Sequence, residues 1–171
     1  MADTPDERLV AVRSAAKRVT EAKETAKTKS REAQNAAARV KSAARKPQAD
    51  TAVANSKNAS AEARKAADIA LEAAETARKA AGMARKAASI AMNEAGGAVK
   101  VAPNEVKAVA AKGGYSKAEL KAAVEASEEL ASGLENEARA VSNDAKEADR
   151  FAKEAEKAAS DAEALAKALF P

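Results

Sequence analysis

The sequence contains no histidine, no cysteine and no tryptophan, and its aromatic residues are one tyrosine and two phenylalanines. Without histidine and cysteine, the chain has neither an imidazole base nor a thiol nucleophile, and it cannot build a thiolate or imidazole metal site. A disulfide framework is excluded for the same reason. We therefore expect that the chain is not an enzyme and that it holds no cofactor.

Large apolar residues are also scarce, because leucine, isoleucine, valine and phenylalanine together number 22 of 171 residues. So few are typical of disordered chains when they come with a large net charge. Here 30 basic residues face 26 acidic ones, and alanine, the best helix former, occurs 53 times. The low ordering cost of alanine offsets the low hydrophobicity, so the sequence predicts long helices that pack together.

The sequence also argues against a membrane-spanning helix, a signal peptide and a nucleic-acid partner. No run of 18 apolar residues occurs, so the sequence predicts no membrane-spanning helix. The acidic residues Asp3, Asp6 and Glu7 lie where a secretory signal would be basic and then apolar, so no signal peptide is expected. Basic residues alternate with acidic ones and only three aromatic residues could stack on bases, so nucleic acid is not an expected partner.

The first two helices are predicted from their stop signals. Proline disfavours helix in the residue before it, so Pro47 ends a first helix over about 4–46. A second helix is expected over about 47–95, because Gly96 and Gly97 offer the left-handed conformation that a helix C-cap adopts.

The third helix is predicted over 116–170, and its start has a capping box formed by Ser116 and Glu119. The segment 96–115 between helices two and three is expected to be a small cap over one end of a bundle. Its Val99, Val101 and Tyr115 either seal that end or form a patch that faces a protein ligand. They are the only candidate binding residues that the sequence offers.

All three helices carry an apolar seam with alternating spacings of three and four residues. Such a repeat predicts a left-handed coiled coil, and alanine lets the backbones approach closely and leaves no cavity for a small-molecule substrate. Lys29 is the one charged residue in the first seam.

We predict a single all-α domain over 1–171, an elongated antiparallel up-down-up three-helix bundle with alanine-rich seams. The seam of the third helix is Leu120, Val124, Ser127, Ala131, Leu134, Ala138, Val141, Ala145, Ala148, Ala152, Ala155, Ala159, Ala162, Ala166 and Leu169.

Charge differs between the helices. Residues 1–50 hold 12 basic and 7 acidic residues, and residues 51–100 hold 8 and 5. Residues 101–171 hold 10 basic and 14 acidic residues. An acidic third helix against two basic ones favours its docking.

One candidate modification site is present. Asn58-Ala59-Ser60 is the only N-glycosylation sequon, and Asn58 is its acceptor. It lies in or near the second predicted helix, and a three-residue pattern occurs by chance in many chains.

The alanine-dominated sequence, the three long helices and the glycine-bounded insert at 96–115 resemble the alanine-rich surface proteins of African trypanosomes, the glutamic acid/alanine-rich protein and its relatives. In architecture these are similar to the variant surface glycoproteins and the haptoglobin–haemoglobin receptor. The resemblance implies a coat protein at the parasite surface, attached through a C-terminal glycolipid (GPI) anchor that is not part of this chain. It implies no catalytic or ligand residues.

Two alternatives to a coat protein stay open. A surface receptor of the same fold would bind a macromolecule through the segment 96–115. A soluble, cytoplasmic stress-protective protein rich in alanine, lysine and glutamate would be disordered in water, although such proteins favour eleven-residue repeats. The oligomeric state does not follow from the sequence.

Overall fold

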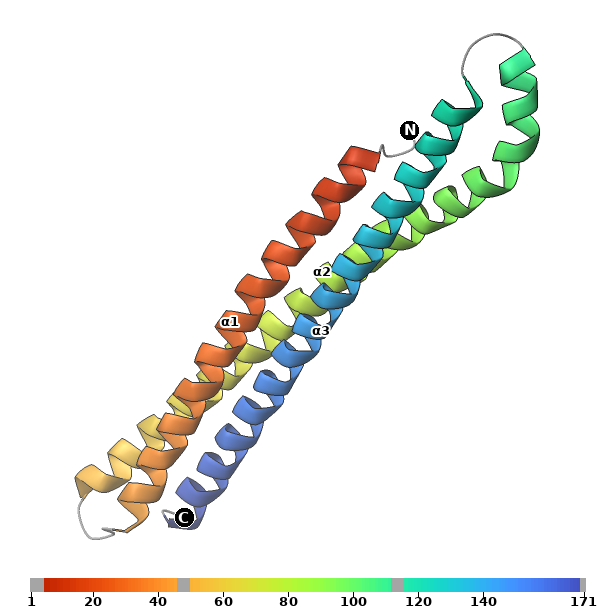
Figure 1. Cartoon of the computed structure of the whole chain (residues 1–171). Coiled ribbons are helices and arrows are strands. Elements are labelled where there is room, and N and C mark those ends of the chain that lie inside the picture. The colour runs from red at the N-terminus through yellow and green to blue at the C-terminus, as the bar shows by residue number, and fades with distance from the viewer. Residues whose placement is uncertain (1–4, 46–49, 112–115, 170–171) are drawn as a thin grey trace. The chain divides into compact units, whose positions relative to one another are not determined.

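The computed structural model describes residues 5–45, 50–111 and 116–169, and at 5–6, 50–52, 97–111, 117, 120 and 169 it describes the backbone alone. These residues form three α-helices that pack against each other, with no strand among them (Figure 1). The helices are α1 (Pro5–Ala44, 40 residues), α2 (Asp50–Ala111, 62 residues) and α3 (Lys117–Leu169, 53 residues). The predicted all-α class is therefore confirmed.

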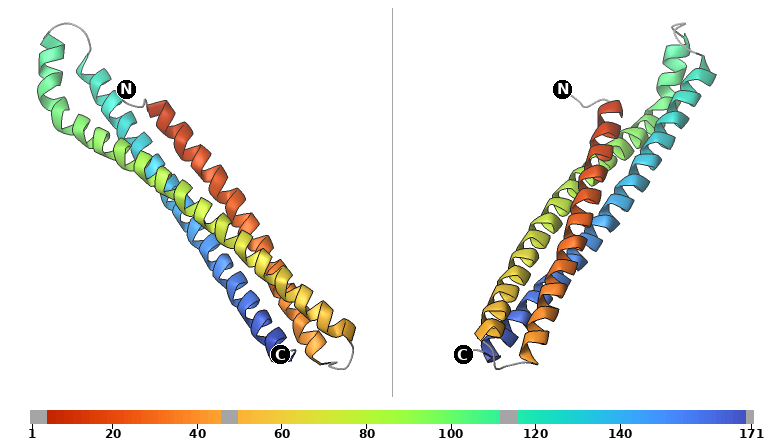
Figure 2. Two further views of the ribbon diagram at one scale, coloured as in Figure 1. Left: turned by 180° about the vertical axis from the view of Figure 1, so that it is seen from behind. Right: turned by 90° about the vertical axis from the view of Figure 1, so that its left-hand side faces the viewer.

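The chain divides into two compact units, and every helix contributes to both. Unit 1 comprises Met1–Lys17 and Ala80–Ser142, and unit 2 comprises Arg18–Lys79 and Asn143–Pro171. The division cuts each long helix once, so each unit is a three-helix assembly. Figure 2 shows from two further sides the three segments of unit 2 lying side by side.

Unit 2 has a core made almost wholly of methyl groups. Its larger buried side chains are Val19 and Val40 of α1, each fully buried. The remaining apolar core is alanine from all three helices, and the short side chains allow the helices to pack closely. These alanines are Ala22, Ala26, Ala33, Ala36 and Ala37 of α1, Ala59, Ala63, Ala66, Ala67, Ala70, Ala73, Ala74 and Ala77 of α2, and Ala145, Ala148, Ala152, Ala155, Ala159, Ala162 and Ala166 of α3.

Unit 1 has a smaller core with relatively more bulk. Val12, Leu134 and Val141 are buried there, together with alanines of each helix. Across both units, 28 of the 33 buried apolar residues in the described core are alanine. The predicted seam of α3 is confirmed from Ala131 to Ala166, where every predicted position is buried.

The predicted end of the second helix is wrong. Helix α2 does not stop at Ala95 but continues through Gly96, Gly97 and Pro103 to Ala111. A glycine in a helix costs only about 0.5–1 kcal/mol relative to alanine, which does not by itself end a helix. Figure 1 shows α2 bending in this last part (green), and the glycines and the proline are the usual causes of a bend.

The seam of α1 shifts by one residue where lysine was predicted. Lys29 is only partly buried and pairs with Glu32, whereas the neighbouring Ser30 is buried to 2% exposure. The spacing from Ala22 through Ala26 to Ser30 is therefore four and four. This local change of spacing keeps the charge of Lys29 out of the core.

The start of α3 follows the predicted capping box. The Ser116 backbone N–H donates to the Glu119 carboxylate at 2.7 Å, and the Glu119 N–H donates to the Ser116 hydroxyl at 3.2 Å. The hydrogen bond from the Ser116 backbone N–H to the carboxylate is the largest cause that lowers the pKa of Glu119 below its ordinary value of 4.5, and the Ser116 side chain lowers it further. The box thus satisfies backbone donors that the first turn leaves unpaired.

Candidate functional site

The structure describes only part of the segment that contains the binding residues predicted from the sequence. Val99 and Val101 lie in the helical backbone of α2, and their side chains lie outside the described residues. Tyr115 lies outside the described residues altogether. The proposed patch of these three residues therefore stays a prediction.

The sequon lies within α2. Asn58 is exposed, whereas Ser60, which completes the sequon, is buried to 8% exposure. The acceptor residue is thus accessible, whereas the serine two residues further on is largely buried. Glycosylation of Asn58 stays a prediction.

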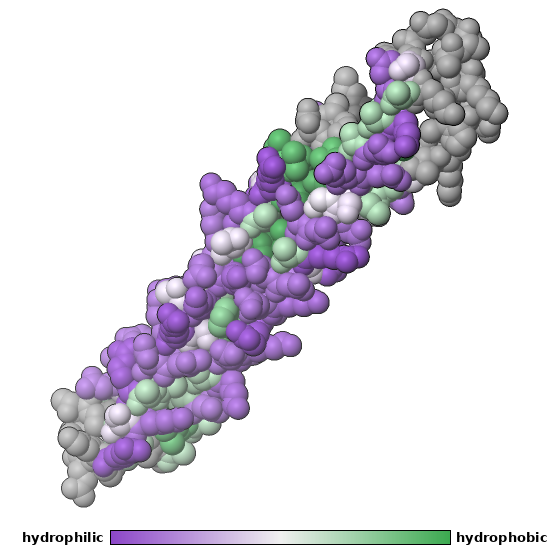
Figure 3. Space-filling model, viewed as in Figure 1, coloured by the Kyte–Doolittle hydropathy of each residue, from purple (hydrophilic) through white to green (hydrophobic). Residues whose placement is uncertain are grey.

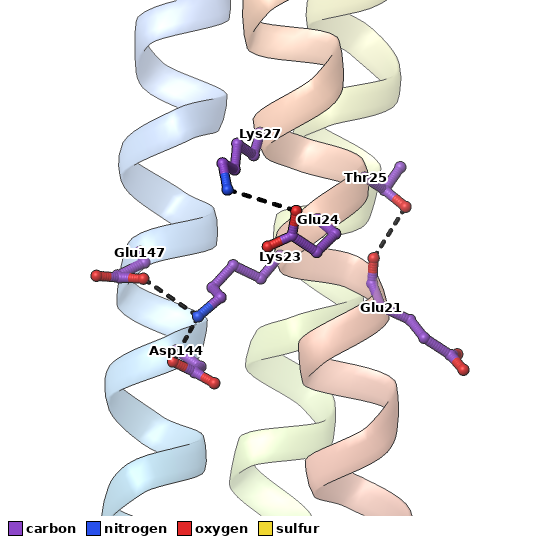
Figure 4. A network of polar contacts seen from close by, with 7 residues as sticks. All are labelled: Glu21, Lys23, Glu24, Thr25, Lys27, Asp144 and Glu147. Atoms are coloured by element: carbon purple, nitrogen blue, oxygen red, sulfur yellow. Dashed lines mark hydrogen bonds and ion pairs between the residues drawn. The ribbon is translucent and has the colours of Figure 1, made fainter.

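The central polar contact of unit 2 links α1 to α3. The Lys23 ammonium group donates to Asp144 at 2.8 Å and lies 3.3 Å from a carboxylate oxygen of Glu147 (Figure 4). The hydrogen bond to Asp144 is the largest cause that raises the pKa of Lys23 above 10.5. The neighbouring pair of Lys27 with Glu24 lies within α1.

Two further interhelical ion pairs stabilise unit 2. Arg78 of α2 donates to Asp149 of α3 at 2.6 Å, and Arg39 of α1 pairs with Glu62 of α2. Lys23 and Arg78 thus both contact acidic residues of α3, the helix whose part of the sequence has an excess of acidic residues.

The polar contacts of unit 1 are partly buried. Arg8 of α1 is 6% exposed, and its guanidinium group donates two hydrogen bonds to the carboxylate of Glu94 on α2, the longer being 2.6 Å. These bonds lower the pKa of Glu94 below 4.5. Arg85 of α2 donates to the buried hydroxyl of Ser142 on α3.

Shallow hollows lie along the seams of unit 2, because alanine does not fill the grooves between the charged flanks. One of about 450 Å³ lies between α1 and α2 and contains the Arg39–Glu62 pair. Two of about 300 Å³ each lie beside Ala22 and Ala73, and between α1 and α3 beside Ala37. On the face in Figure 3, hydrophilic residues (purple) cover most of the described surface and hydrophobic residues (green) show only in patches.

The hollow between α2 and α3 is larger, at about 530 Å³. Its charged side chains are Lys57, Arg64, Lys65 and Asp68 of α2 and Glu163 and Lys167 of α3. Ser60, Ala61 and Ala166 complete the lining. Sequence analysis did not identify this group, although basic residues seven and eight positions apart on α2 would have indicated a basic stripe.

Apolar side chains of appreciable size are exposed in unit 1. Met83 and Ile90, seven residues apart on α2, are 51% and 37% exposed, and Met92 is 41% exposed. Val10 on α1 is 66% exposed. Single exposed apolar residues are common on protein surfaces and do not define a binding site.

The described residues hold no group of three or more acidic side chains placed to bind a metal ion. None of the helices, within the part of the chain that was described, combines the length and the apolarity needed to cross a membrane.

Together these features define an all-helical protein whose helices are joined by alanine seams and interhelical ion pairs. No family model matches the sequence, and comparisons with curated proteins and with solved structures found no match.

Proposed function

We propose that the chain is a non-enzymatic structural protein that acts as a helical rod. The observation that carries the proposal is the composition of the core, in which 28 of 33 buried apolar residues are alanine. A core of this kind joins helices over a long distance with little bulk. At about 1.5 Å per residue, helices of 40, 62 and 53 residues are about 60, 93 and 80 Å long.

The proposed rod has the antiparallel up-down-up order. Arg39, late in α1, contacts Glu62, early in α2, which supports a reversal between these helices. Lys23 of α1 contacts Asp144 of α3, and Gln34 shares a hollow with Glu154, which supports a common direction for α1 and α3. The proposal also includes a cap formed by 96–115. Because α2 continues to Ala111, the last part of this helix belongs to the proposed cap.

At the cellular level we propose a coat protein of a parasite surface, held by a C-terminal lipid anchor. The support is the resemblance to the alanine-rich surface proteins of African trypanosomes. A surface layer of rods needs polar sides that repel their neighbours weakly and remain hydrated. Charged residues make up 33% of the sequence and both signs alternate along the helices, which suits this role.

Small-angle X-ray scattering on the purified chain tests the rod. Because α2 bends in its last part, we expect a largest dimension of at least about 80 Å, the length of the 53-residue α3, and a cross-section of three helices. A compact globule would contradict the proposal, and so would the profile of a flexible coil. Antibody labelling of intact against permeabilised cells then tests the surface location, and labelling only after permeabilisation would contradict the coat.

A further inference from the structure

We propose that the hollow between α2 and α3 in unit 2 binds a phosphate or sulfate group of a small ligand. The site consists of the ammonium groups of Lys57, Lys65 and Lys167, the guanidinium group of Arg64, and the hydroxyl of Ser60. The proposal does not depend on the function proposed above, because it concerns one local surface of unit 2.

The first argument is the charge that the hollow leaves unbalanced. Arg64 lies 3.3 Å from Asp68 and is therefore partly neutralised. The three lysines form no ion pair with the residues that the structure describes, and Glu163 is the one remaining acidic group of the lining. Three unpaired ammonium groups against one carboxylate leave an excess of about two positive charges, which a dianion would neutralise.

The second argument is a comparison with the other hollows of unit 2. In the hollow between α1 and α2, Lys29 pairs with Glu32 at 2.7 Å and Arg39 pairs with Glu62, which leaves one lining cation, Lys65, that also borders the α2–α3 hollow. The hollow between α1 and α3 has two basic and two acidic residues, and the one beside Ala73 has one basic and two acidic residues. Of the four, the α2–α3 hollow has the largest positive excess.

The third argument is a hydroxyl without a partner at the base of the hollow. Ser60 is 8% exposed, and its hydroxyl makes no hydrogen bond with the described residues. The hydroxyl lines the hollow, so a ligand oxygen that accepts its hydrogen bond would gain affinity. Because Ser60 has a short side chain on a helix, its hydroxyl has a well-defined position in the site, whereas the lysine side chains are long and flexible.

The volume indicates the size of the ligand. A hollow of about 530 Å³ exceeds what a single tetrahedral oxyanion occupies, so it has room for an organic part. The methyl groups of Ala61 and Ala166 offer that part a small apolar surface. A phosphate or sulfate monoester, whether on a sugar or on a lipid headgroup, has this combination of charge and size.

Backbone amide NMR titrations with inorganic phosphate and with inorganic sulfate, at constant ionic strength, test the site. We expect saturable shifts at Ser60, Arg64 and Lys167. The double variant Lys65→Gln/Lys167→Gln should bind about tenfold more weakly. The control Lys79→Gln/Lys86→Gln removes two exposed lysines of α2 outside the hollow and should bind as the wild type does.

The Ser60→Ala variant separates binding from folding. It should bind phosphate severalfold more weakly, while its melting temperature stays the same or rises because an unpaired hydroxyl is removed. Unchanged affinity in Ser60→Ala would overturn the proposal. Equal losses in the two double variants, or shifts spread evenly over exposed lysines, would overturn it as well.

Two further probes distinguish the sources of the anion. Binding to vesicles that contain phosphatidic acid, if inorganic phosphate competes with it and the Lys65→Gln/Lys167→Gln variant loses it, assigns the group to a lipid headgroup. Binding of a sulfated disaccharide with the same dependence, and none to vesicles, assigns it to a soluble ester. If none of the probes and neither inorganic ion binds, the proposal is wrong.

Discussion

Arg8 of α1 and Glu94 of α2, which are 86 positions apart in the sequence, form a two-pronged ion pair in unit 1. The arginine is buried to 6% exposure, whereas the glutamate is 54% exposed. The Glu94 carboxylate therefore neutralises the positive charge of Arg8, which the surrounding protein largely shields from water. Such a pair stabilises the docking of α1 mainly because an isolated buried arginine would be costly.

Substitution of Glu94 tests that view. Glu94→Gln should lower the melting temperature, since the buried Arg8 loses the charged group that accepts two of its hydrogen bonds. The double variant Arg8→Met/Glu94→Gln should recover part of the loss, because the buried charge is gone as well. Circular dichroism melts measure both, and a single variant as stable as the wild type would show that Arg8 reaches solvent readily.

The same pair predicts a dependence on acid. The pKa of Glu94 is lowered, so its contribution is complete above the unfolded value of about 4.5 and is lost as the pH falls through its folded-state pKa. The wild type should therefore lose more stability than Glu94→Gln between neutral pH and strongly acidic pH. Parallel melting curves for the two proteins would contradict this assignment.

The Lys23 contact predicts the opposite dependence. The pKa of Lys23 is raised, so its contribution is complete below about 10.5 and is lost as the pH rises through the folded-state value. A double-mutant cycle with Lys23→Gln and Asp144→Asn should give a coupling of about 0.2–1 kcal/mol, as for other largely exposed pairs. Urea unfolding at neutral pH and at a pH above the folded-state pKa of Lys23 measures it, and a coupling that persists at the higher pH would exclude the ammonium group as its source.

The alanine seam predicts a low tolerance for larger side chains. Ala155 on α3 is fully buried, so Ala155→Leu should destabilise the protein by about 1–3 kcal/mol through overpacking. Ala140, on the same helix but exposed, is the matched control, and Ala140→Leu should change stability by about 0.5 kcal/mol or less. Stabilisation by Ala155→Leu would mean that the helices are farther apart than their alanine contacts indicate.

Two glycines inside helices are expected to be replaceable. A Cβ atom added at Gly82 or Gly133 would meet no atom within 4 Å, and both residues are exposed. Gly82→Ala and Gly133→Ala should therefore each stabilise the protein by about 0.5–1 kcal/mol, since alanine restricts the unfolded chain more and favours helix. Chemical denaturation measures the gain, and a loss at either position would reveal a need for backbone flexibility there.

Ser56 offers a similar gain in the core. Its side chain is fully buried, and its hydroxyl has no hydrogen-bond partner among the described residues. Ser56→Ala should raise the free energy of unfolding by about 1 kcal/mol. Ser142→Ala is the contrasting control, because the Ser142 hydroxyl accepts a hydrogen bond from Arg85 and its removal should not stabilise.

Features that depend on a few neighbouring residues were predictable from the sequence. The Ser116–Glu119 capping box is one, because its residue types and spacing determine its hydrogen bonds. The α3 seam is another, since a regular repeat over many turns places each residue on a known face. The end of α2 was not predictable, because two glycines only weaken a helix and the balance depends on the surroundings.

The interhelical contacts could be predicted from the sequence only in part. Net charges of the helices indicated that α3 would attract basic residues, yet the partner of Lys23 depends on the axial alignment of two helices. The choice between Lys29 and Ser30 as the buried residue likewise depends on the packing of α1 as a whole. The α2–α3 hollow has the same origin, since its lysines come from residues about 100 positions apart.

The uniformity of the core has a consequence for alignment. If one helix slid along another by seven residues, most alanines would meet alanines again, and the core alone would register almost no penalty. The axial alignment of the helices must then be fixed by the few branched residues, such as Val19 and Leu134, and by the charged contacts between helices. Their loss would produce misaligned but still helical molecules, which would have a normal far-ultraviolet circular dichroism spectrum and an altered length.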